Sequence, residues 1–600
     1  MARQAGTSAA AAAKQRTSRV AKSRSKDHDG HPPKASRGIK PWMWMAAAGA
    51  AMAIFLAWLT LRRKAANKAA PGTSAPVTSA PVEESPGSAL DPQITALVER
   101  AELLFSQGRM GEAMDVLVAA YRLDVSSTRA LEVLSAYQNS FGGKVPKHVK
   151  TAIKASMSRF ELVLYSDLYD KGQLQGEDNL LGLAKLKMLY HPLHDPNQAL
   201  SDVMSASGIL SAIGEQGASQ QVKRCKDYAQ GLQERLRHRV TLTHDLEVGS
   251  SAQELASRLL PEPSFESVDR RANLSMEEYR HLYVKKRRPV IITDYAEHTL
   301  PPMEGATDQS SGRTSVWGWM EMLQVCGNMN VTLSQRHPEA RHLWAGLGIS
   351  RNSKFAEWIG EIREGRAANA TYLMDHGLAG RCSAFLEHFV VPKYFAGDLF
   401  KRLSFNENGG RDMFPHHPSV FAGVAGSGGS LHVDSHASTF WQLLLRGRKR
   451  WTLYSLPDSL RRVLLYAGVE HEVLPLVPLP GEVRNLSRTP LLAVADAFKV
   501  VVEVKAGDLI MVPHDVPHMV ENVEDVLAIS MNVLDDVAVP RLIEDLHARS
   551  CFSSDEALLA NLRVLQKAAE TQSADSAASP IADARDVPFA EYQRYGPLSG

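Results

Sequence analysis

The chain has 600 residues, with 68 Lys and Arg against 66 Asp and Glu, so its formal net charge is only +2. This length allows roughly two to four domains with a large core, and the charge balance gives no reason to expect a nucleic-acid partner. The four cysteines form no CxxC pair, which excludes a zinc ribbon or a disulfide-dense scaffold but leaves one or two bridges open.

The N-terminal part is predicted to tether the rest of the chain. Residues 1–40 are rich in Ala, Ser, Lys and Arg without apolar periodicity, which predicts a disordered basic arm. Residues 41–61 contain no charged residue and are long enough for a bilayer core of about 30 Å, which predicts a single transmembrane helix. The longer basic run on its N-terminal side favours a cytoplasmic N-terminus and a body in the ER or secretory lumen. Residues 62–92 are a flexible linker rich in Pro, Ala, Ser and Thr.

Residues 93–240 have apolar residues at spacings of three and four, which predicts an α-helical region. The segment AELLFSQGRMGEAMDVLVAAYRLD resembles one tetratricopeptide repeat, but the pattern does not recur cleanly at 34 residues. This TPR-like region is expected to be either a plain spacer or a module that binds a protein partner or substrate.

The composition changes again near residue 261, and residues 262–540 are predicted to form one domain. Residues 288–293 indicate a buried strand, and helical or irregular chain is expected after it. Beyond a Gly- and Ser-rich bend, short β-rich runs follow one another: 440–445, 449–454, 500–504, 508–512 and 526–533. This spacing predicts an all-β double-stranded β-helix, a cupin-like jelly roll, with flanking helices. Residues 541–571 are expected to be helices that cap the barrel or form a homodimer, and residues 572–600 a loose tail.

The candidate chemistry begins at His432-Val433-Asp434. In a strand, residues two apart project to the same face, so the histidine and the aspartate can bind one metal ion together. His514 and His518 follow in a second segment, and either would complete a set of two histidines and one carboxylate. That set is typical of non-haem iron(II) oxygenases.

Around these residues the chain resembles the JmjC family of 2-oxoglutarate oxygenases. Within that family it is similar to the branch of arginine demethylases and lysyl hydroxylases once called phosphatidylserine receptor. The resemblance covers about residues 262 to 540, and three segments carry it: VPKYFAGDLF, GSGGSLHVDSHASTFWQLLLRGRKRWTLYSLP and AGDLIMVPHDVPHMVENVEDVLAISMN. The family spacing implies that His432, Asp434 and His518 hold the metal.

The resemblance also implies the cofactor and the residues that bind the cosubstrates. The metal would be Fe(II), and 2-oxoglutarate and O2 would be the cosubstrates. Lys449, seventeen residues after His432, would bind the far carboxylate of 2-oxoglutarate. Ser530 and Asn532 on the last strand, and Gln442 in the place of a family asparagine, would form hydrogen bonds with it.

One departure from the family pattern lies three residues before His432, where a threonine is frequent and Gly429 stands here. Ser427 or Ser430 can supply the missing hydroxyl group. The implied reaction is oxidative decarboxylation of 2-oxoglutarate to succinate and CO2, with hydroxylation or demethylation of a protein side chain.

Two other classes of function stay open from the sequence. The first is an inactive membrane-tethered scaffold, with a relic barrel and a TPR-like interaction region. The second is a cupin-type isomerase or sugar-binding barrel, although such sites need no lysine at position 449. The basic arm also permits a nuclear-targeting interpretation.

Overall fold

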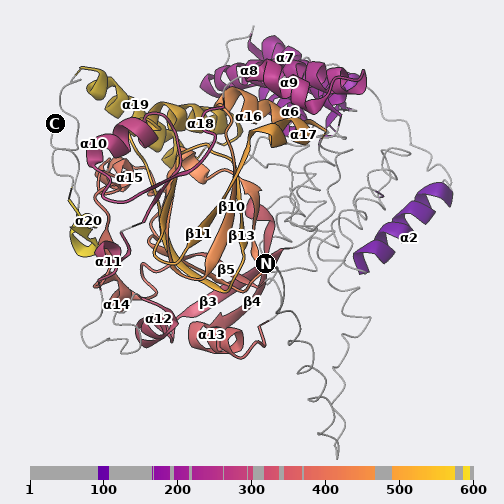
Figure 1. Cartoon of the computed structure of the whole chain (residues 1–600). Coiled ribbons are helices and arrows are strands. Elements are labelled where there is room, and N and C mark those ends of the chain that lie inside the picture. The colour runs from indigo at the N-terminus through magenta and orange to yellow at the C-terminus, as the bar shows by residue number, and fades with distance from the viewer. Residues whose placement is uncertain are drawn as a thin grey trace, which may run out of the picture. The chain divides into compact units, whose positions relative to one another are not determined.

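The computed structural model describes residues 92–106 and most of 165–594 (Figure 1). Only scattered residues are described between 107 and 164, and the larger later gaps are 190–194, 215–218, 302–316, 337–343, 466–489 and 575–584. Two sheets that enclose one apolar interior form the centre of the described chain, as the predicted jelly roll requires.

The larger sheet has nine strands, in the spatial order β1-β2-β12-β9-β14-β7-β5-β3-β4. Their bounds are β1 Asp269–Arg271, β2 Val290–Ile292, β3 Asn330–Arg336, β4 Leu347–Lys354, β5 Tyr372–Gly377, β7 Ser419–Gly423, β9 Thr439–Arg446, β12 Leu509–Val512 and β14 Val526–Val533. The smaller sheet has the order β11-β10-β13-β8, with bounds β8 Gly428–His432, β10 Arg448–Tyr454, β11 Lys499–Lys505 and β13 His518–Asn522. A third pair consists of β6 (Val390–Val391) and β15 (Val587–Pro588).

The central strands of the larger sheet are buried on both faces, so their sequences are nearly continuous apolar runs rather than alternating ones. Alternate residues of β9 and β14 still separate into two cores. Phe440, Leu444 and Ala528 face the space between the sheets, whereas Trp441 and Ile529 face the outer helices. This division determines which side chains of these strands enter the barrel.

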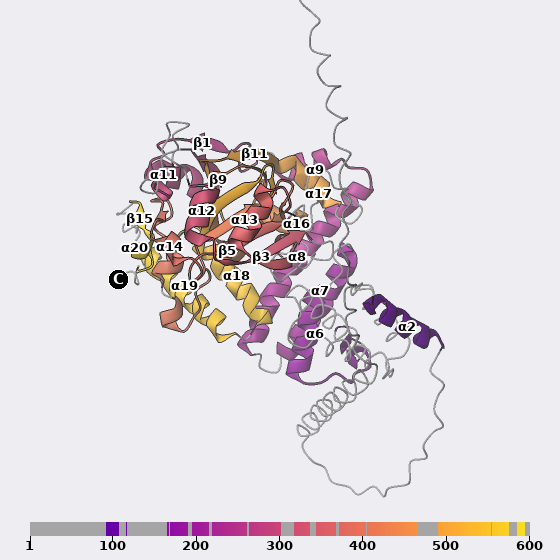
Figure 2. The same cartoon turned by 90° about the horizontal axis from the view of Figure 1, so that it is seen from below.

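Short helices cover the outer face of the larger sheet. Figure 2 shows α12 (Trp319–Cys326) and α13 (Phe355–Arg363) across β3 and β5, and their buried tryptophans pack into the same apolar core as those strands. The other short elements of this region are α10 Met276–Glu278, η1 Tyr279–Val284, α11 Ala296–Thr299, η3 Trp344–Gly346, α14 Ser383–Leu386, α15 Leu399–Arg402, η4 Phe405–Asn408, η5 Ser435–Ala437, α16 Asp458–Leu464, α17 Leu491–Ala495 and η7 Asp496–Phe498.

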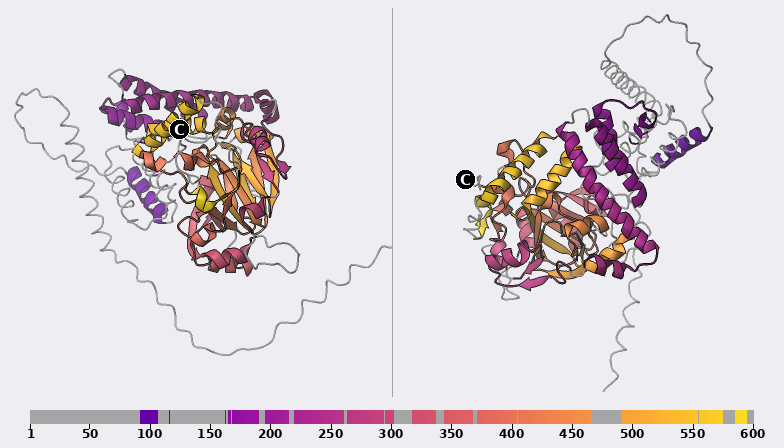
Figure 3. Two further views of the ribbon diagram at one scale, coloured as in Figure 1. Left: turned by 90° about the vertical axis from the view of Figure 1, so that its left-hand side faces the viewer. Right: turned by 90° about the horizontal axis from the view of Figure 1, so that it is seen from above.

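Long helices pack beside the barrel (Figure 3). The described helices before the barrel are α2 Pro92–Ser106, α6 Glu177–Leu189, α7 Pro196–Gly214, α8 Gln220–Glu247 and α9 Ala252–Leu259, and those after it are α18 Val539–Phe552, α19 Glu556–Ala574 and α20 Phe589–Tyr592. Helices α6, α7 and α8 share one apolar core, which also contains Cys551 of α18. A disulfide between Cys225 and Cys551 links α8 to α18, and a second bridge joins Cys326 to Cys382.

The structure corrects the sequence analysis in two places within residues 262–600. The chain after β2, expected to be helical or irregular, also contains β3, β4 and β5, which extend the larger sheet. The C-terminal segment, expected to be a loose tail, returns to the barrel at β15 and α20. There Tyr592 is buried and its hydroxyl group donates a hydrogen bond to Asp398.

The N-terminal predictions lie largely outside the described residues. These include the basic arm 1–40, the transmembrane helix 41–61, almost all of the linker 62–92 and most of the predicted tetratricopeptide repeat. In the part of the chain that the structure does describe, no helix is long and apolar enough to cross a bilayer. The predicted location, a single-pass membrane protein with a lumenal body, is corrected on this finding.

Candidate active site

The pairing of β8 with β13 brings the predicted metal ligands together. His432 ends β8, His518 begins β13, and the two residues are direct partners across the antiparallel pair. Their rings meet edge to face with 4.3 Å between centroids, and His518 Nε2 lies 3.9 Å from Asp434 Oδ2. One ligand atom from each of the three residues lies within 4.8 Å of the others.

Hydrogen bonds determine which ring nitrogens of the two histidines can bind a metal. His432 Nδ1 is 2.6 Å from the carbonyl oxygen of Ser430, and His518 Nδ1 is 2.9 Å from that of Val516. Because a carbonyl oxygen only accepts, each Nδ1 carries the proton and each Nε2 keeps its lone pair. Two neutral imidazoles and one carboxylate therefore converge, a donor set that fits Fe(II) and leaves coordination positions open.

The electrostatics of these three residues also suit a cation. Burial lowers the pKa of His518 to about 4 and that of His432 well below its usual range, so both rings are neutral at pH 7. Burial, followed by the negative charge of Asp375, raises the pKa of Asp434 to about 8. A divalent cation would reverse this last effect, because it favours the ionised carboxylate.

Lys449 occupies the barrel interior behind the metal ligands. It lies on β10, where Trp451 and Leu453 also face the interior, while Arg448 and Arg450 turn outward to glutamates. Only 1% of Lys449 is exposed, and burial lowers its pKa to about 7. Its Nζ donates a hydrogen bond to the hydroxyl group of Tyr372 at 3.1 Å.

The remaining predicted residues lie on the barrel-facing sides of β9 and β14. Gln442 and Ser530 are cross-strand partners and both are buried. Ser530 Oγ makes no hydrogen bond to any described residue, and the same holds for Ser430 Oγ. Buried hydroxyl groups without partners are uncommon, so these two fit an interior that receives a polar ligand.

The structure distinguishes between Ser427 and Ser430, the two serines proposed to supply the hydroxyl group that is missing at Gly429. Ser427 Oγ donates to the carbonyl oxygen of Val424 and accepts from Asn522 Nδ2. Ser427 is therefore already engaged, and Ser430 is the better source of the hydroxyl group.

The side chain of Asn532 forms its hydrogen bonds beside the predicted metal ligands. Its Nδ2 donates to Ser438 Oγ at 2.8 Å, and its side chain also forms a hydrogen bond with Asp434. In this structure Asn532 therefore orients Asp434, one of the predicted metal ligands. The role predicted for it, a hydrogen bond to 2-oxoglutarate, stays a prediction.

The rival ligand His514 does not join the cluster. Its carbonyl oxygen accepts a hydrogen bond from Arg287, and burial lowers the pKa of its ring. Of the described residues that could surround the same metal as His432 and Asp434, only His518 supplies the second imidazole. This agrees with the family spacing.

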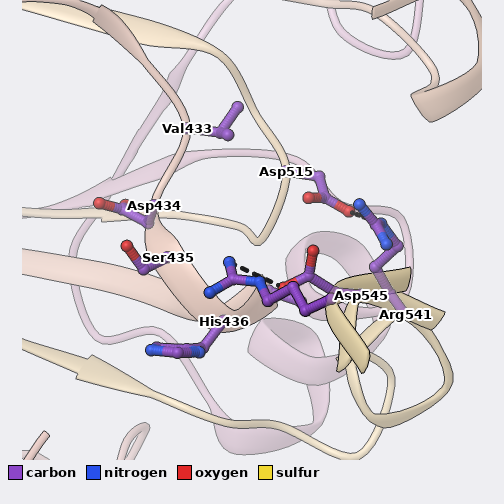
Figure 4. Close-up of a pocket in the computed structure, with 9 residues that line it drawn as sticks. Val433, Asp434, Ser435, His436, Asp515, Arg541 and Asp545 are labelled. Atoms are coloured by element: carbon purple, nitrogen blue, oxygen red, sulfur yellow. Dashed lines mark hydrogen bonds and ion pairs between the residues drawn. The ribbon is translucent and has the colours of Figure 1, made fainter. Parts of the chain in front are cut away.

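Sequence reasoning missed two sets of residues at this site. Tyr372 lies on β5, far before the HxD motif and within no motif of its own, and only the β5–β7 pairing brings it to Lys449. A buried ion-pair network also holds the loop before His518, where Asp515 lies between Arg461 and Arg541. Asp434, Asp515 and Arg541 line one pocket, and Figure 4 shows Asp515 and Arg541 together on the side of it away from Asp434.

A two-sheet barrel with a buried His-x-Asp…His set and an interior lysine is the architecture of a cupin-like domain. Residues 276–534 match the model of the cupin-like domain family, and this segment is a cupin-like domain of the JmjC type.

Several curated proteins are similar to this domain. The lysine-specific demethylase JMJ21 of Arabidopsis thaliana is 25% identical over 267 residues, which are 44% of this chain and 25% of that protein. The bifunctional arginine demethylase and lysyl-hydroxylase psr-1 of Caenorhabditis elegans is 27% identical over 183 residues, 30% of this chain and 39% of that protein. The human 2-oxoglutarate and iron-dependent oxygenase JMJD4 is 25% identical over 172 residues, 28% of this chain and 38% of that protein. The matched segment is thus less than half the length of each relative.

Proposed function

We propose that this chain is an Fe(II)- and 2-oxoglutarate-dependent oxygenase that hydroxylates or demethylates a protein side chain. One observation carries the proposal: His432, Asp434 and His518 each bring one ligand atom within 4.8 Å of the others, and Nδ1 of both histidines faces a backbone carbonyl oxygen, which leaves Nε2 as the metal-binding nitrogen. When bound there, Fe(II) supplies the activation of O2 that such a reaction needs.

The chain's own residues account for binding of the keto acid. Lys449 is the buried cation of the barrel interior, and a carboxylate brought beside it would be held by a charge-assisted hydrogen bond. The Tyr372 hydroxyl group, already bonded to Lys449, can donate to the same carboxylate once Lys449 turns to it. The unpartnered hydroxyl groups of Ser530 and Ser430 complete a polar lining.

An inactive scaffold with a relic barrel is the alternative. A barrel that has lost its ligand gains stability when buried polar groups are replaced by apolar ones, since each unpaired group costs about 1 to 3 kcal/mol. Here the interior retains a lysine and several hydroxyl groups. That pattern supports a working site over a relic.

The test is turnover of 2-oxoglutarate by the purified chain with Fe(II) and O2, measured as succinate released. Wild-type protein should form succinate, and Asp434→Ala should form none above the background without enzyme. His514→Gln is the matched control, because this buried histidine lies outside the ligand set, and it should keep most of the activity. Equal activity in Asp434→Ala and wild type would refute the assignment.

The substrate is proposed to be a protein, with the TPR-like helical region as a docking module. Hydroxylation and demethylation can be told apart by their products, because hydroxylation of an N-methyl group ends in release of formaldehyde. Lysine-containing and methylarginine-containing peptides are the first to test, since relatives of this domain are named for both residues. Mass spectrometry would show a gain of one oxygen in the first case and loss of a methyl group in the second.

A further inference from the structure

A second group of histidines and an aspartate lies beside the predicted iron site. Asp375 of β5 and the adjacent His416 and His417, just before β7, place one ligand atom each within 4.8 Å of one another. His416 Nε2 is 3.4 Å from Asp375 Oδ2, and His417 Nε2 is 3.5 Å from Asp375 Oδ1. By composition and spacing this group matches the His432, Asp434 and His518 set.

The hydrogen bonds of the two groups are opposite. His417 Nδ1 accepts the backbone N–H of Asn532 at 3.1 Å, whereas Nδ1 of His432 and of His518 faces a carbonyl oxygen. A neutral ring that accepts at Nδ1 must carry its proton on Nε2. The Nε2 of His417 therefore has no lone pair for a metal, and it lies 3.5 Å from Asp375 Oδ1, close to the carboxylate but without a formed hydrogen bond.

The ionisation of the pair is consistent with this arrangement. Burial lowers the pKa of His417, so that its ring stays neutral. Burial opposes ionisation of Asp375, but the two neighbouring imidazoles outweigh it and hold the pKa of that carboxyl well below its usual range. A carboxylate that faces an imidazole N–H fixes both the tautomer and the orientation of the ring.

Asn532 connects this pair to the metal ligand. Its backbone N–H donates to His417, and its side-chain amide bonds to Ser438 and to Asp434. Phe414 stacks on the His417 ring at 4.8 Å between centroids and restricts it from the other side. His417 thus lies against the carboxylate of Asp375, and hydrogen bonds connect it through Asn532 to Asp434.

We propose that His417, held by Asp375, is a positioning residue that orients the metal ligand Asp434 through Asn532, and that this second group is not a metal site. The inference rests on the proposed function for its relevance to catalysis. Its test is binding of Co(II), which does not require turnover. A wrong role for His417 would appear in Co(II) affinity, whereas a wrong oxygenase assignment would appear in succinate release.

The wild-type chain titrated with Co(II), and followed by calorimetry and by visible absorption, should bind one equivalent. His417→Phe keeps a ring for Phe414 to stack on but removes the acceptor for the Asn532 N–H. It should weaken Co(II) binding by about 10-fold or more, in the range found when partners of metal ligands are lost. His417→Asn places an oxygen near the position of Nδ1 and should recover most of the affinity.

The matched control is His416→Phe, which alters the same group without touching Asn532 and should leave Co(II) affinity within about 2-fold of wild type. Two results would overturn the inference. One is a second Co(II) equivalent that is lost in His416→Phe and retained in Asp434→Ala. The other is unchanged affinity in a folded His417→Phe. The number of Co(II) ions bound by the wild-type chain shows whether a second metal site exists, even if a variant fails to fold.

Discussion

Lys449 offers the sharpest test of the barrel interior, through the substitution Lys449→Met. Methionine has a similar length and no charge, so it should fill the space beside Tyr372 without the ammonium group. Truncating one partner of a buried, hydrogen-bonded charge pair typically costs about 2 to 5 kcal/mol. We therefore expect the KM for 2-oxoglutarate to rise by about 30-fold or more, since about 1.4 kcal/mol is a factor of ten.

The same substitution should stabilise the metal-free chain. Burial lowers the pKa of Lys449 from 10.5 to about 7, and this difference corresponds to roughly 3 to 5 kcal/mol of unfavourable free energy for the charged form. Between pH 7 and 10.5 the unfolded chain binds a proton that the folded chain does not, so wild-type stability rises with pH over that window. The gain in stability from Lys449→Met should therefore be largest at or below pH 7 and shrink toward pH 10.

The two assays are succinate release as a function of 2-oxoglutarate concentration, and thermal unfolding of the metal-free protein at several pH values. The matched control is Arg448→Met, because Arg448 directly precedes Lys449 on β10 but points outward to Glu503 and Glu524 with 43% of its side chain exposed. It should change the KM by no more than about 2-fold, as expected for a surface ion pair. A KM within about 3-fold of wild type in Lys449→Met would refute the role of this lysine.

Three further outcomes are expected. Because the pKa of Asp434 is raised to about 8, metal binding should release about one proton at pH 7 and much less at pH 9, measurable by calorimetry in buffers of different ionisation enthalpy; equal release at both values would contradict this. Replacing both Cys225 and Cys551 by Ala should lower the free energy of unfolding by about 2 to 5 kcal/mol in urea, because their bridge closes a loop of 326 residues; an unchanged midpoint would count against the bridge. Gly447→Ala, where a Cβ would lie 2.2 Å from a backbone oxygen at φ +78°, should destabilise the chain more than Gly507→Ala, where φ is +91° but the space is open; equal unfolding midpoints would show that the close approach does not matter.

The strands of the barrel were largely predictable because their signal is local. The five β-rich runs expected after residue 440 correspond to β9, β10, β11, β12 and β14, each with bounds close to those predicted. Their β-branched and apolar residues are bounded by turns, and this pattern does not depend on what the strand pairs with. The strands β3, β4 and β5 were missed, since each is half-polar and joins the sheet only through its neighbours.

Some residues of the candidate site were likewise predictable from local sequence, and others were not. His432 and Asp434 could be paired from the sequence because residues two apart on a strand share a face. The family spacing implied that Lys449 points inward, and alternation along β10 then places Arg448 and Arg450 outside, as the structure shows. His518 needed the family spacing, because His514 satisfies the local chemistry equally well and only the register between β8 and β13 places His518 opposite His432.

By itself, then, the sequence determined the barrel strands and the His-x-Asp pair, both from patterns local to one strand, while the buried cation needed the family spacing as well. Only the tertiary structure decided which residues support them. It brought Tyr372 to Lys449, placed His417 against the backbone of Asn532, and returned Tyr592 to Asp398. The physical reason is that such contacts depend on strand register and on the closure of long loops, and neither leaves a periodic trace in the chain.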